Sequence, residues 1–390
     1  MSDNKKSDNR KRILGKRTLA VLLLVLVLVA SIDFMNRFLC IPMTSNQTTV
    51  INMHHEPTGS IDVLLLGSSA TYSGFASAYA YELYGFTSYP YALAGGTCTM
   101  WKPALQDALR TQDPELIVVD AFTGGYDPEE IKHRCNQAYT VMTHTHFSKE
   151  KIASARELSV SIDGTNTLSY IIPFLRYHNR VPSNLRKLGD RIELERFGAS
   201  PLKGIQNISS ARKLRKPDES GFSDETLPLD PDTERIIRDF MDYCKSRDIK
   251  VLFVKYPSVL SRKHPEELLV NFRANRILEI ADEYSFSTLD LQKRFYEIGL
   301  DEKKDFYNHG HTNVRGQKKI TAFLGDYIQN TLHIAPSELN NDLKAAWDES
   351  ITYYQAYCDL NEELMQDGKK KELWDSPDLV RKLSERIGKY

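Results

Sequence analysis

Two adjacent serines, Ser68 and Ser69, follow an apolar run of strand length, Ile61–Leu66. A serine on the sharp turn after a buried parallel strand lies at the carboxyl edge of the sheet, where open α/β folds bind their ligands. A helix that starts there points its N-terminal amides at the same place and can stabilise an oxyanion. The serine hydroxyl could then attack an acyl carbon, provided that a base removes its proton. The alternative is an ordinary strand-to-helix turn with a capping serine.

A second polar segment, residues 305–316, supplies groups that such a serine needs. His311 lies on a glycine-containing loop, and Asp305 and Asn308 precede it by six and three residues. A histidine base needs an acceptor at its other ring nitrogen, and a carboxylate or amide one turn earlier on a short helical loop would reach it. His309 is the competing base. We therefore expect a Ser-His pair whose third member is Asp305 or Asn308, with Asp305 contributing more to activity.

These segments need a scaffold that brings them together, and the apolar pattern predicts one. Continuous apolar runs are typical of strands buried on both faces of a parallel sheet. The expected strands are 61–66, 87–93, 116–119, 250–255 and 286–289, and the helices between and after them include 76–83, 100–110, 232–247, 265–284 and 317–332. The alternation predicts an α/β fold with a doubly wound parallel sheet.

Two regions lie outside this alternation. Residues 128–231 are rich in charge and weak in periodicity. We expect them to form a helical cap or a wall of the substrate cleft, as an insertion in a domain spanning residues 60–335. Residues 336–390 form a highly charged tail that is expected to be helical, and its aromatic side chains would dock it on the domain or on a partner.

The N-terminal region predicts a membrane anchor. Residues 1–17 carry seven Lys and Arg, and an uncharged apolar run begins at Thr18. We expect a basic cytoplasmic tail at 1–17, a transmembrane signal anchor at 18–39, a polar stalk at 40–59 and an extracytoplasmic location for the rest of the chain. This predicts a single-pass protein of the cell membrane. The alternative is a cleaved signal peptide, because its apolar region has a similar length.

Charge and cysteine content exclude several classes of protein. The chain has 51 basic and 52 acidic residues, and a net charge of -1 argues against nucleic-acid binding through bulk electrostatics. Its five cysteines are scattered without a CxxC pair, so neither a zinc site nor a disulfide framework is indicated, although Cys98 and Cys135 could form a bridge. His144 and His146 lack nearby metal ligands at suitable spacing. No cofactor or metal is expected.

The serine and histidine segments resemble the SGNH, or GDSL-type, hydrolase superfamily, whose first block is a strand ending in Gly-Asp-Ser and whose last is Asp-x-x-His. VLLLGSS at 63–69 is similar to the first block, with Ser68 in the Asp position, as in the membrane-anchored bacterial branch that resembles DltD and alginate O-acetylation proteins. The resemblance implies that Ser69 is the nucleophile. HTNVRG at 311–316 is similar to the histidine block, which makes His311 the base.

The remaining blocks match in part. YALAGGT at 91–97 resembles the second block, which implies that Gly95 or Gly96 donates an amide to the oxyanion hole together with the Ser69 amide. The third block normally supplies an Asn, but this chain has DAFTGG at 120–125. The acid position three residues before His311 holds Asn308, so the acid is either Asp305 or an amide that replaces it.

The resemblance also implies a fold and a function. The fold would be a flavodoxin-like three-layer α/β/α arrangement. The function would be a membrane-anchored, extracytoplasmic serine esterase or O-acyltransferase that acts on acyl groups of cell-surface polysaccharide or teichoic acid. The alternative is a catalytically inactive binding or assembly protein of the cell envelope with the same fold.

Overall fold

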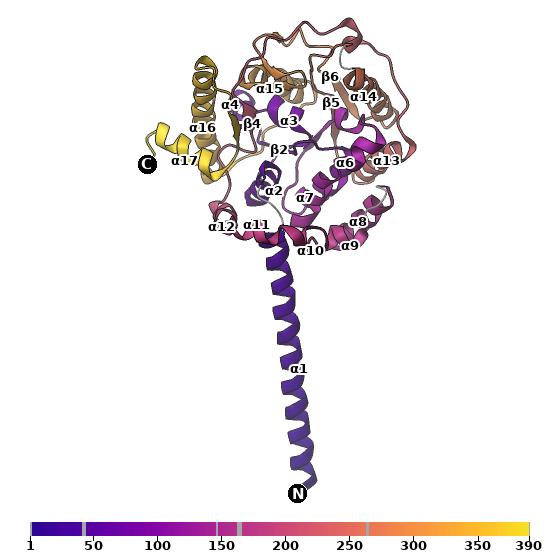
Figure 1. Ribbon diagram of the computed structural model, residues 1–390, viewed down its shortest axis with the longest axis vertical. Helices are drawn as coiled ribbons and strands as arrows, with labels where there is room; N and C mark the ends of the chain where they lie inside the picture. The colour runs from indigo at the N-terminus through magenta and orange to yellow at the C-terminus, as the bar shows by residue number, and fades with distance from the viewer. Residues whose placement is uncertain (1, 41–43, 146, 162–165, 263–264, 390) are drawn as a thin grey trace.

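The computed structural model describes residues 2–40, 44–145, 147–161, 166–262 and 265–389. A long N-terminal helix, α1 (Ser2–Phe34), projects from a body that is built around a parallel sheet (Figure 1). The sheet has five strands in the order β2-β1-β3-β5-β6. Their bounds are β1 (Val63–Gly67), β2 (Ser88–Ala92), β3 (Leu116–Asp120), β5 (Val251–Lys255) and β6 (Ser287–Asp290). Counted along the chain, this is the strand order of flavodoxin-type doubly wound sheets. The predicted α/β class with a parallel sheet is confirmed.

The central strands are apolar on both faces because helices cover both. Along β1, Leu64 and Leu66 contribute to one core cluster, whereas Val63 and Leu65 contribute to the other. The first cluster includes residues of α5 (Trp101–Ala108), α13 (Pro231–Lys245) and α14 (Pro265–Glu283). The second includes residues of α4 (Ser77–Tyr84), α15 (Val314–Asp326) and η6 (Tyr327–Thr331). The helices cover the two faces of the sheet, so its carboxyl edge is formed by the polar loops that follow the strands.

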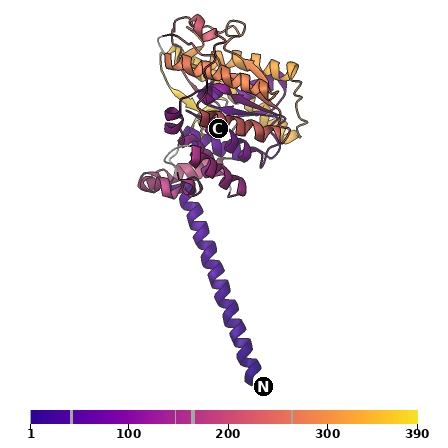
Figure 2. The same cartoon turned by 90° about the vertical axis from the view of Figure 1, so that its right-hand side faces the viewer.

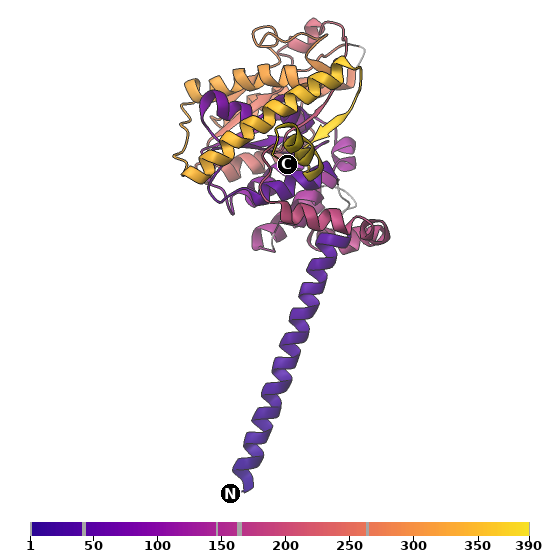
Figure 3. The ribbon, with the colours of Figure 1, turned by 90° about the vertical axis from the view of Figure 1, so that its left-hand side faces the viewer.

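The predicted insertion is helical in its first part and mostly irregular in its second. Its helices are α6 (Pro128–His133), α7 (Asn136–His144), α8 (Lys149–Ser161), α9 (Thr167–Ile171), α10 (Phe174–Tyr177), η4 (His178–Arg180), α11 (Val181–Leu185) and α12 (Leu188–Phe197), followed by β4 (Gln206–Ile208) and η5 (Glu219–Phe222). Of these, α10, α11 and α12 pack against η1 (Met35–Cys40), which continues α1. Figure 2 and Figure 3 show this layer of helices around the end of α1 from two sides. Helices α10 to α12 of the insertion therefore lie at the anchor, whereas Glu130 of α6 and Arg134 after it line a pocket at the sheet edge and form part of its wall.

The described part of the segment predicted to be a stalk (40–59), residues 40 and 44–59, instead belongs to the domain, so that prediction is wrong. It contains α2 (Ser45–His55), which packs against α7 and β2 and buries Gln47–Met53. The backbone N–H of Ala94 donates to Asn46 Oδ1 at 2.7 Å, and the Tyr89 hydroxyl donates to the Thr49 carbonyl at 2.8 Å. Because these partners are distant in sequence, the polar composition of α2 suggested exposure to solvent although its residues are buried.

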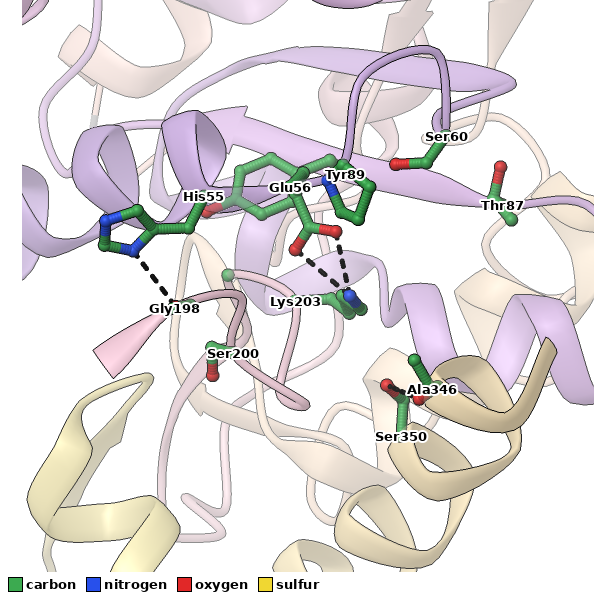
Figure 4. Close-up of polar contacts among 12 residues, drawn as sticks. His55, Glu56, Ser60, Thr87, Tyr89, Gly198, Ser200, Lys203, Ala346 and Ser350 are labelled. Carbon is green, nitrogen blue, oxygen red and sulfur yellow. Dashed lines mark hydrogen bonds and ion pairs between the residues drawn. The ribbon is translucent and has the colours of Figure 1, made fainter. Parts of the chain in front are cut away.

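A buried ion pair fixes the end of α2. The Glu56 carboxylate accepts hydrogen bonds of 2.8 and 3.1 Å from the Lys203 ammonium (Figure 4). The side chains of Glu56 and Lys203 are 1% and 4% exposed. Lys203 Nζ also lies 4.8 Å from the ring centroid of Trp347 in α16 (Asn341–Gln366). Three segments that are far apart in sequence therefore meet at this α2 junction.

The C-terminal tail docks on the domain, which is one of the two outcomes expected for it. After α16, β9 (Glu372–Trp374) pairs antiparallel with β4, and the chain ends in α17 (Pro377–Arg386). Trp347 and Tyr354 of α16 are buried. The five cysteines all lie within the described residues, and each is a buried free thiol, so Cys98 and Cys135 do not form a bridge.

The apolar N-terminal segment has the length of a membrane span. Residues Ile13–Cys40 form a continuous helical stretch of 28 residues, and its most apolar window of 18 residues has a mean hydropathy of 2.6 and is not buried. The structure thus supports one N-terminal helix that could cross a membrane or serve as a signal anchor.

Candidate active site

Ser69 lies at the carboxyl edge of the sheet, on the first residue of α3 (Ser69–Gly74). Ser68 precedes it as the helix N-cap in an extended conformation. The sharp turn after β1 brings the Ser69 hydroxyl to the surface of the domain, where its Oγ lies 2.5 Å from His311 Nε2. The structure therefore joins the two sequence-predicted segments through a hydrogen bond between residues 242 positions apart.

The other ring nitrogen of His311 contacts Asn308. Nδ1 lies 2.7 Å from Asn308 Oδ1, and the same oxygen accepts the Gly310 N–H at 3.0 Å. Because the backbone N–H requires an acceptor, the amide oxygen faces the ring, and Nδ1 must carry the proton. Nε2 is then unprotonated and can accept the Ser69 hydroxyl proton. The ring is in the tautomer that a serine nucleophile needs.

A short hairpin explains why Asn308 occupies this place. β7 (Phe306–Asn308) pairs antiparallel with β8 (His311–Thr312), with Asn308 opposite His311. In the helical loop expected from the sequence, an acid one turn further back could also reach the ring. In a hairpin, the side chain of His311 lies next to that of the residue directly opposite on the paired strand, which is Asn308.

Asp305 does not contact the His311 ring, so the expectation that it reaches in to orient the imidazole is wrong. Its carboxylate is buried and pairs with Lys319 Nζ at 2.6 Å, and it also accepts the Asp301 N–H at 2.8 Å. The two nitrogens of His311 are already occupied by Ser69 and Asn308. Asp305 instead holds the hairpin to α15.

Hydrogen bonds between α3, β8 and α15 set the distance between serine and histidine. The Thr312 hydroxyl donates to the Ser73 carbonyl at 2.7 Å, and Gln317 Nε2 donates to the Tyr72 carbonyl at 2.8 Å. Asn313 is fully buried and caps α15, since its Oδ1 accepts the Arg315 N–H at 3.0 Å. No motif singled out Thr312 or Gln317, because their partners are main-chain groups of another segment.

The environment keeps the His311 ring neutral. Burial lowers the pKa of His311 from 6.5 to about 4. The ring of Tyr307 stacks on it with centroids 5.4 Å apart, and its Nδ1 partner is an uncharged amide. The imidazole is therefore unprotonated, as a general base must be, at any pH well above 4.

Ser68 fills a structural role beside Ser69. Its hydroxyl donates to Asp120 Oδ2 at 3.1 Å, and the other oxygen of Asp120 accepts the Phe122 N–H at 3.1 Å. Burial raises the pKa of Asp120 to about 7. A Cβ at Gly67 would lie 2.7 Å from the Cβ of Asp120, so the glycine permits this close approach of β1 and β3. Ser68 is thus held away from the role of nucleophile.

Two of the three expected oxyanion donors remain available. Ser69 opens α3, so its N–H has no intrahelical acceptor. The Gly96 N–H donates to the Leu93 carbonyl at 2.8 Å, so the expectation for Gly96 is wrong. Gly95 adopts a left-handed conformation with φ 71°, and its N–H has no hydrogen-bond partner within the described part of the chain. Of the two expected glycines, only Gly95 therefore has an N–H that remains unpaired among the described residues.

The Ser-His pair lies in a pocket of about 470 Å³. This is a size typical of small-ligand sites. Its apolar walls include Phe122, Tyr126, Tyr256, Leu260 and Val270, and its polar lining includes Ser68, Asn308, His309, Glu130, Arg134, Glu266 and Glu267. Arg134 pairs with Glu130 at 2.6 Å and lies over the ring of Tyr126. Tyr126, Arg134 and Tyr256 were not singled out from the sequence, because none belongs to a motif.

The residues that the structure describes contain no group of three or more His, Cys, Asp or Glu side chains suited to a metal ion. His144 is buried and hydrogen-bonded to Gln47, and His146 lies outside the described residues. His309, the competing base, lines the pocket, but its ring does not take the place beside Ser69 that His311 occupies.

No protein-family model matches the chain, and no curated protein matches it either. The chemistry of the site therefore rests on the geometry of its own residues.

Proposed function

We propose that the protein is an SGNH-like serine esterase or O-acyltransferase that acts on acyl esters outside the cytoplasm. The observation that carries the proposal is the hydrogen-bonded series Ser69–His311–Asn308 at the carboxyl edge of a parallel sheet. A nucleophile, a neutral base and a group that orients the base are the three parts that serine-dependent acyl transfer requires.

The proposed reaction has two half-reactions. Ser69 Oγ attacks the acyl carbon while its proton passes to His311 Nε2, and the oxyanion is stabilised by the N–H groups of Ser69 and Gly95. His311 then returns the proton to the leaving alcohol oxygen, which leaves an acyl group on Ser69. Water or a second hydroxyl attacks this ester, His311 takes the new proton, and the Ser69 hydroxyl is restored by that proton. Atoms and charge balance without a cofactor.

Asn308 takes the place that a carboxylate has in most such series. An amide that turned its nitrogen to the ring would impose the wrong tautomer. Here the Gly310 N–H holds the oxygen toward His311, which prevents that outcome. The amide orients the imidazole, but it stabilises the positive charge that forms during the reaction less than a carboxylate would. We therefore expect a slower enzyme than one with an acidic third member.

A basic segment beside the pocket supports an anionic polymer as the carrier of the acyl group. Arg212, Lys213, Arg215 and Lys216 are exposed, and none forms an ion pair with a described carboxylate. Together with Val259, Ser261 and His309 they line a hollow of about 290 Å³. His309 lines both this hollow and the pocket at Ser69. Acylated teichoic acid or an acidic surface polysaccharide would fit this arrangement.

Two features of the N-terminal region support an anchored, extracytoplasmic location. The basic residues before the apolar helix favour a cytoplasmic N-terminus. The segment after the helix is integrated into the fold, because Cys40 is buried and Asn184 Nδ2 donates to the Leu39 carbonyl at 3.0 Å. This favours a retained signal anchor over a cleaved signal peptide.

A second candidate function is a binding or assembly protein of the envelope that no longer turns over. Two observations favour it. An amide occupies the place of a carboxylate at the His311 ring. The turn at residues 120–125 also has no Asn side chain that could donate a hydrogen bond to an oxyanion. The two functions differ in whether Ser69 is reactive.

Labelling with a fluorophosphonate probe distinguishes the two. The full-length protein in detergent should be labelled, the Ser69→Ala variant should not, and the Ser68→Ala variant should keep its label. Thermal unfolding of each variant shows whether it is folded. A folded wild-type protein that takes up no label would leave only the binding function.

A further inference from the structure

The helices of the insertion form a layer at the point where the anchor helix meets the domain. In Figure 1, α10, α11 and α12 lie beside the upper end of α1, and Figure 2 and Figure 3 show the same layer from other sides. The layer is fixed to the anchor by hydrogen bonds. The Phe174 N–H donates to Asn36 Oδ1 at 3.1 Å, and Asn184 Nδ2 donates to the Leu39 carbonyl at 3.0 Å. We call residues 167–197, which comprise α9 to α12, the collar.

The collar lies level with the end of the apolar helix. The uncharged run ends at Ile32, and Asp33 follows it. A hydrocarbon core about 30 Å thick accommodates about 20 helical residues. A span that ends at Ile32 then starts near Ile13, and the long side chains of Lys16 and Arg17 extend to the inner headgroups. Asp33 then marks the outer boundary of the hydrocarbon, and η1 begins two residues later. Because the collar packs on η1, it lies at the height of the lipid headgroups.

The collar carries large apolar side chains that are exposed to solvent in the isolated protein. Beyond residue 40, the described part of the chain exposes eight large apolar side chains, and five of them lie between residues 147 and 185. The four in the collar are Leu168, Phe174, Leu175 and Leu185, with exposed fractions of 53%, 38%, 50% and 52%. This concentration on one layer is the pattern expected of a surface that has a partner.

The charge of the first 23 residues of the collar, which carry all four exposed apolar side chains, favours a lipid partner. Residues 167–189 contain four basic residues and no Asp or Glu, in a chain that is nearly neutral overall. The basic side chains are Arg176, Arg180, Arg186 and Lys187. Apolar side chains interspersed with Arg and Lys are characteristic of helices that lie in the interface of an anionic bilayer.

We propose that the collar rests on the outer leaflet of the membrane, with its exposed apolar side chains among the acyl-chain ends and its basic side chains near lipid phosphates. The partner is the lipid surface itself, because the collar is continuous with the helix that enters that surface. One consequence is that the domain does not swing freely on a stalk. The collar fixes the height and orientation of the Ser69 pocket above the membrane, so an acyl ester must be presented at that height.

Fluorescence of a single label in the full-length protein tests this proposal. Leu175→Cys is labelled with an environment-sensitive dye and placed in nanodiscs of phosphatidylcholine and phosphatidylglycerol. The five native cysteines are buried, so the unsubstituted protein gives the background labelling. Leu269→Cys is the matched control, because Leu269 is also an exposed leucine, 43% exposed, but lies on α14 away from α1 (Figure 1).

The label at 175 should emit at shorter wavelength than the label at 269, and lipids that carry a spin label near the headgroup should quench it several-fold more strongly. A second variant, Leu185→Glu in the Leu175→Cys background, should shift the emission back toward that of water while the protein stays folded. A water-like label at 175 in nanodiscs would overturn the proposal. A shielded label that spin-labelled lipid does not quench would also overturn it, since protein would then cover the collar.

Discussion

The carboxyl edge of the sheet and the α2 junction both bury polar groups, but they hold them in different charge states. At the sheet edge, Ser69, His311 and Asn308 are joined by hydrogen bonds between neutral groups. At the junction, Glu56 and Lys203 form an ion pair that is almost fully removed from water. The first arrangement is able to take up charge during a reaction, whereas the second already carries its charges in the resting state.

Because of this difference, we expect one region to matter for activity and the other for stability. A neutral network costs little to bury, and a charge that develops in it during the proposed acyl transfer would be met by groups already in place. A buried ion pair compensates the desolvation of each partner by the other, so loss of one partner leaves an unpaired buried charge. Substitutions at the sheet edge should therefore change rates, and substitutions at the junction should change the free energy of unfolding.

The largest expected effect is on stability at the junction. Lys203→Met should lower the free energy of unfolding by about 3–5 kcal/mol, because Glu56 remains buried without its partner. The matched control is Lys250→Met, which breaks an exposed pair with Glu115. That change should cost less than about 1 kcal/mol. Denaturant unfolding measures both, and equal losses would contradict the assigned role of the buried pair.

At the sheet edge, two neighbouring positions should behave differently. Asn308→Ala should lower kcat by about 10²-fold or more with little change in stability, since His311 loses the group that holds its tautomer. Asp305→Ala should leave kcat nearly unchanged but lower the free energy of unfolding by about 1–2 kcal/mol, because the Asp301 N–H and Lys319 lose their acceptor. Steady-state kinetics with a small ester and denaturant unfolding separate the two. A larger loss of kcat in the Asp305 variant would show that the ring is oriented differently.

Asn308→Asp should move the acidic limb of the pH–rate profile. The pKa of His311 is lowered from 6.5 to about 4, so kcat/KM of the wild type should fall only as the pH approaches 4. A carboxylate at Nδ1 favours the charged ring and should raise this pKa by about 1–3 units. The limb should then move to higher pH by the same amount.

The same variant should alter stability in a defined pH range. Between pH 4 and 6.5 the unfolded chain binds a proton at residue 311 that the folded protein does not, so this histidine makes the wild type more stable as the pH rises through that range. In Asn308→Asp that dependence should become shallower. An unmoved limb together with an unchanged slope would mean that position 308 does not contact the ring in solution.

The smallest expected effect concerns the basic segment. Replacing Lys213, Arg215 and Lys216 with Gln should raise KM for an O-acetylated anionic polymer by about fivefold at low salt, as exposed ionic contacts are individually weak. Kinetics with a small neutral ester should not change. The charge-matched control replaces Lys245, Arg247 and Lys250, which lie near the start of β5, at the opposite edge of the sheet. Equal changes in both triple variants would assign the effect to net charge alone.

The sequence was informative where the determinants are local. Residues 61–66 and 116–119 predict β1 and β3 within a residue or two because continuous apolar runs reflect burial on both faces. The turn after β1 and the identity of His311 were likewise accessible from short motifs. The strands and the Ser-His pair could therefore be predicted before their contacts were known.

Non-local determinants limited the rest. Asn308 reaches His311 because the segment forms a hairpin, and a polar loop with glycine does not reveal whether it is helical or extended. The polar residues of α2 are buried because their partners, such as Ala94 and Tyr89, come from other parts of the chain. Gly96 was lost as an oxyanion donor through a turn hydrogen bond to Leu93. Each of these contacts depends on the tertiary fold.

The central claim is that Ser69 carries the acyl group during the reaction. Rapid acid quenching of the full-length protein with 4-nitrophenyl acetate, followed by peptide mass spectrometry, tests it most directly. We predict one acetyl group on the peptide that contains Ser69, located at Ser69 itself and absent in His311→Gln. Turnover of the ester with the acetyl group on Ser68, or with no acyl-enzyme and unchanged rates in Ser69→Ala, would contradict the account.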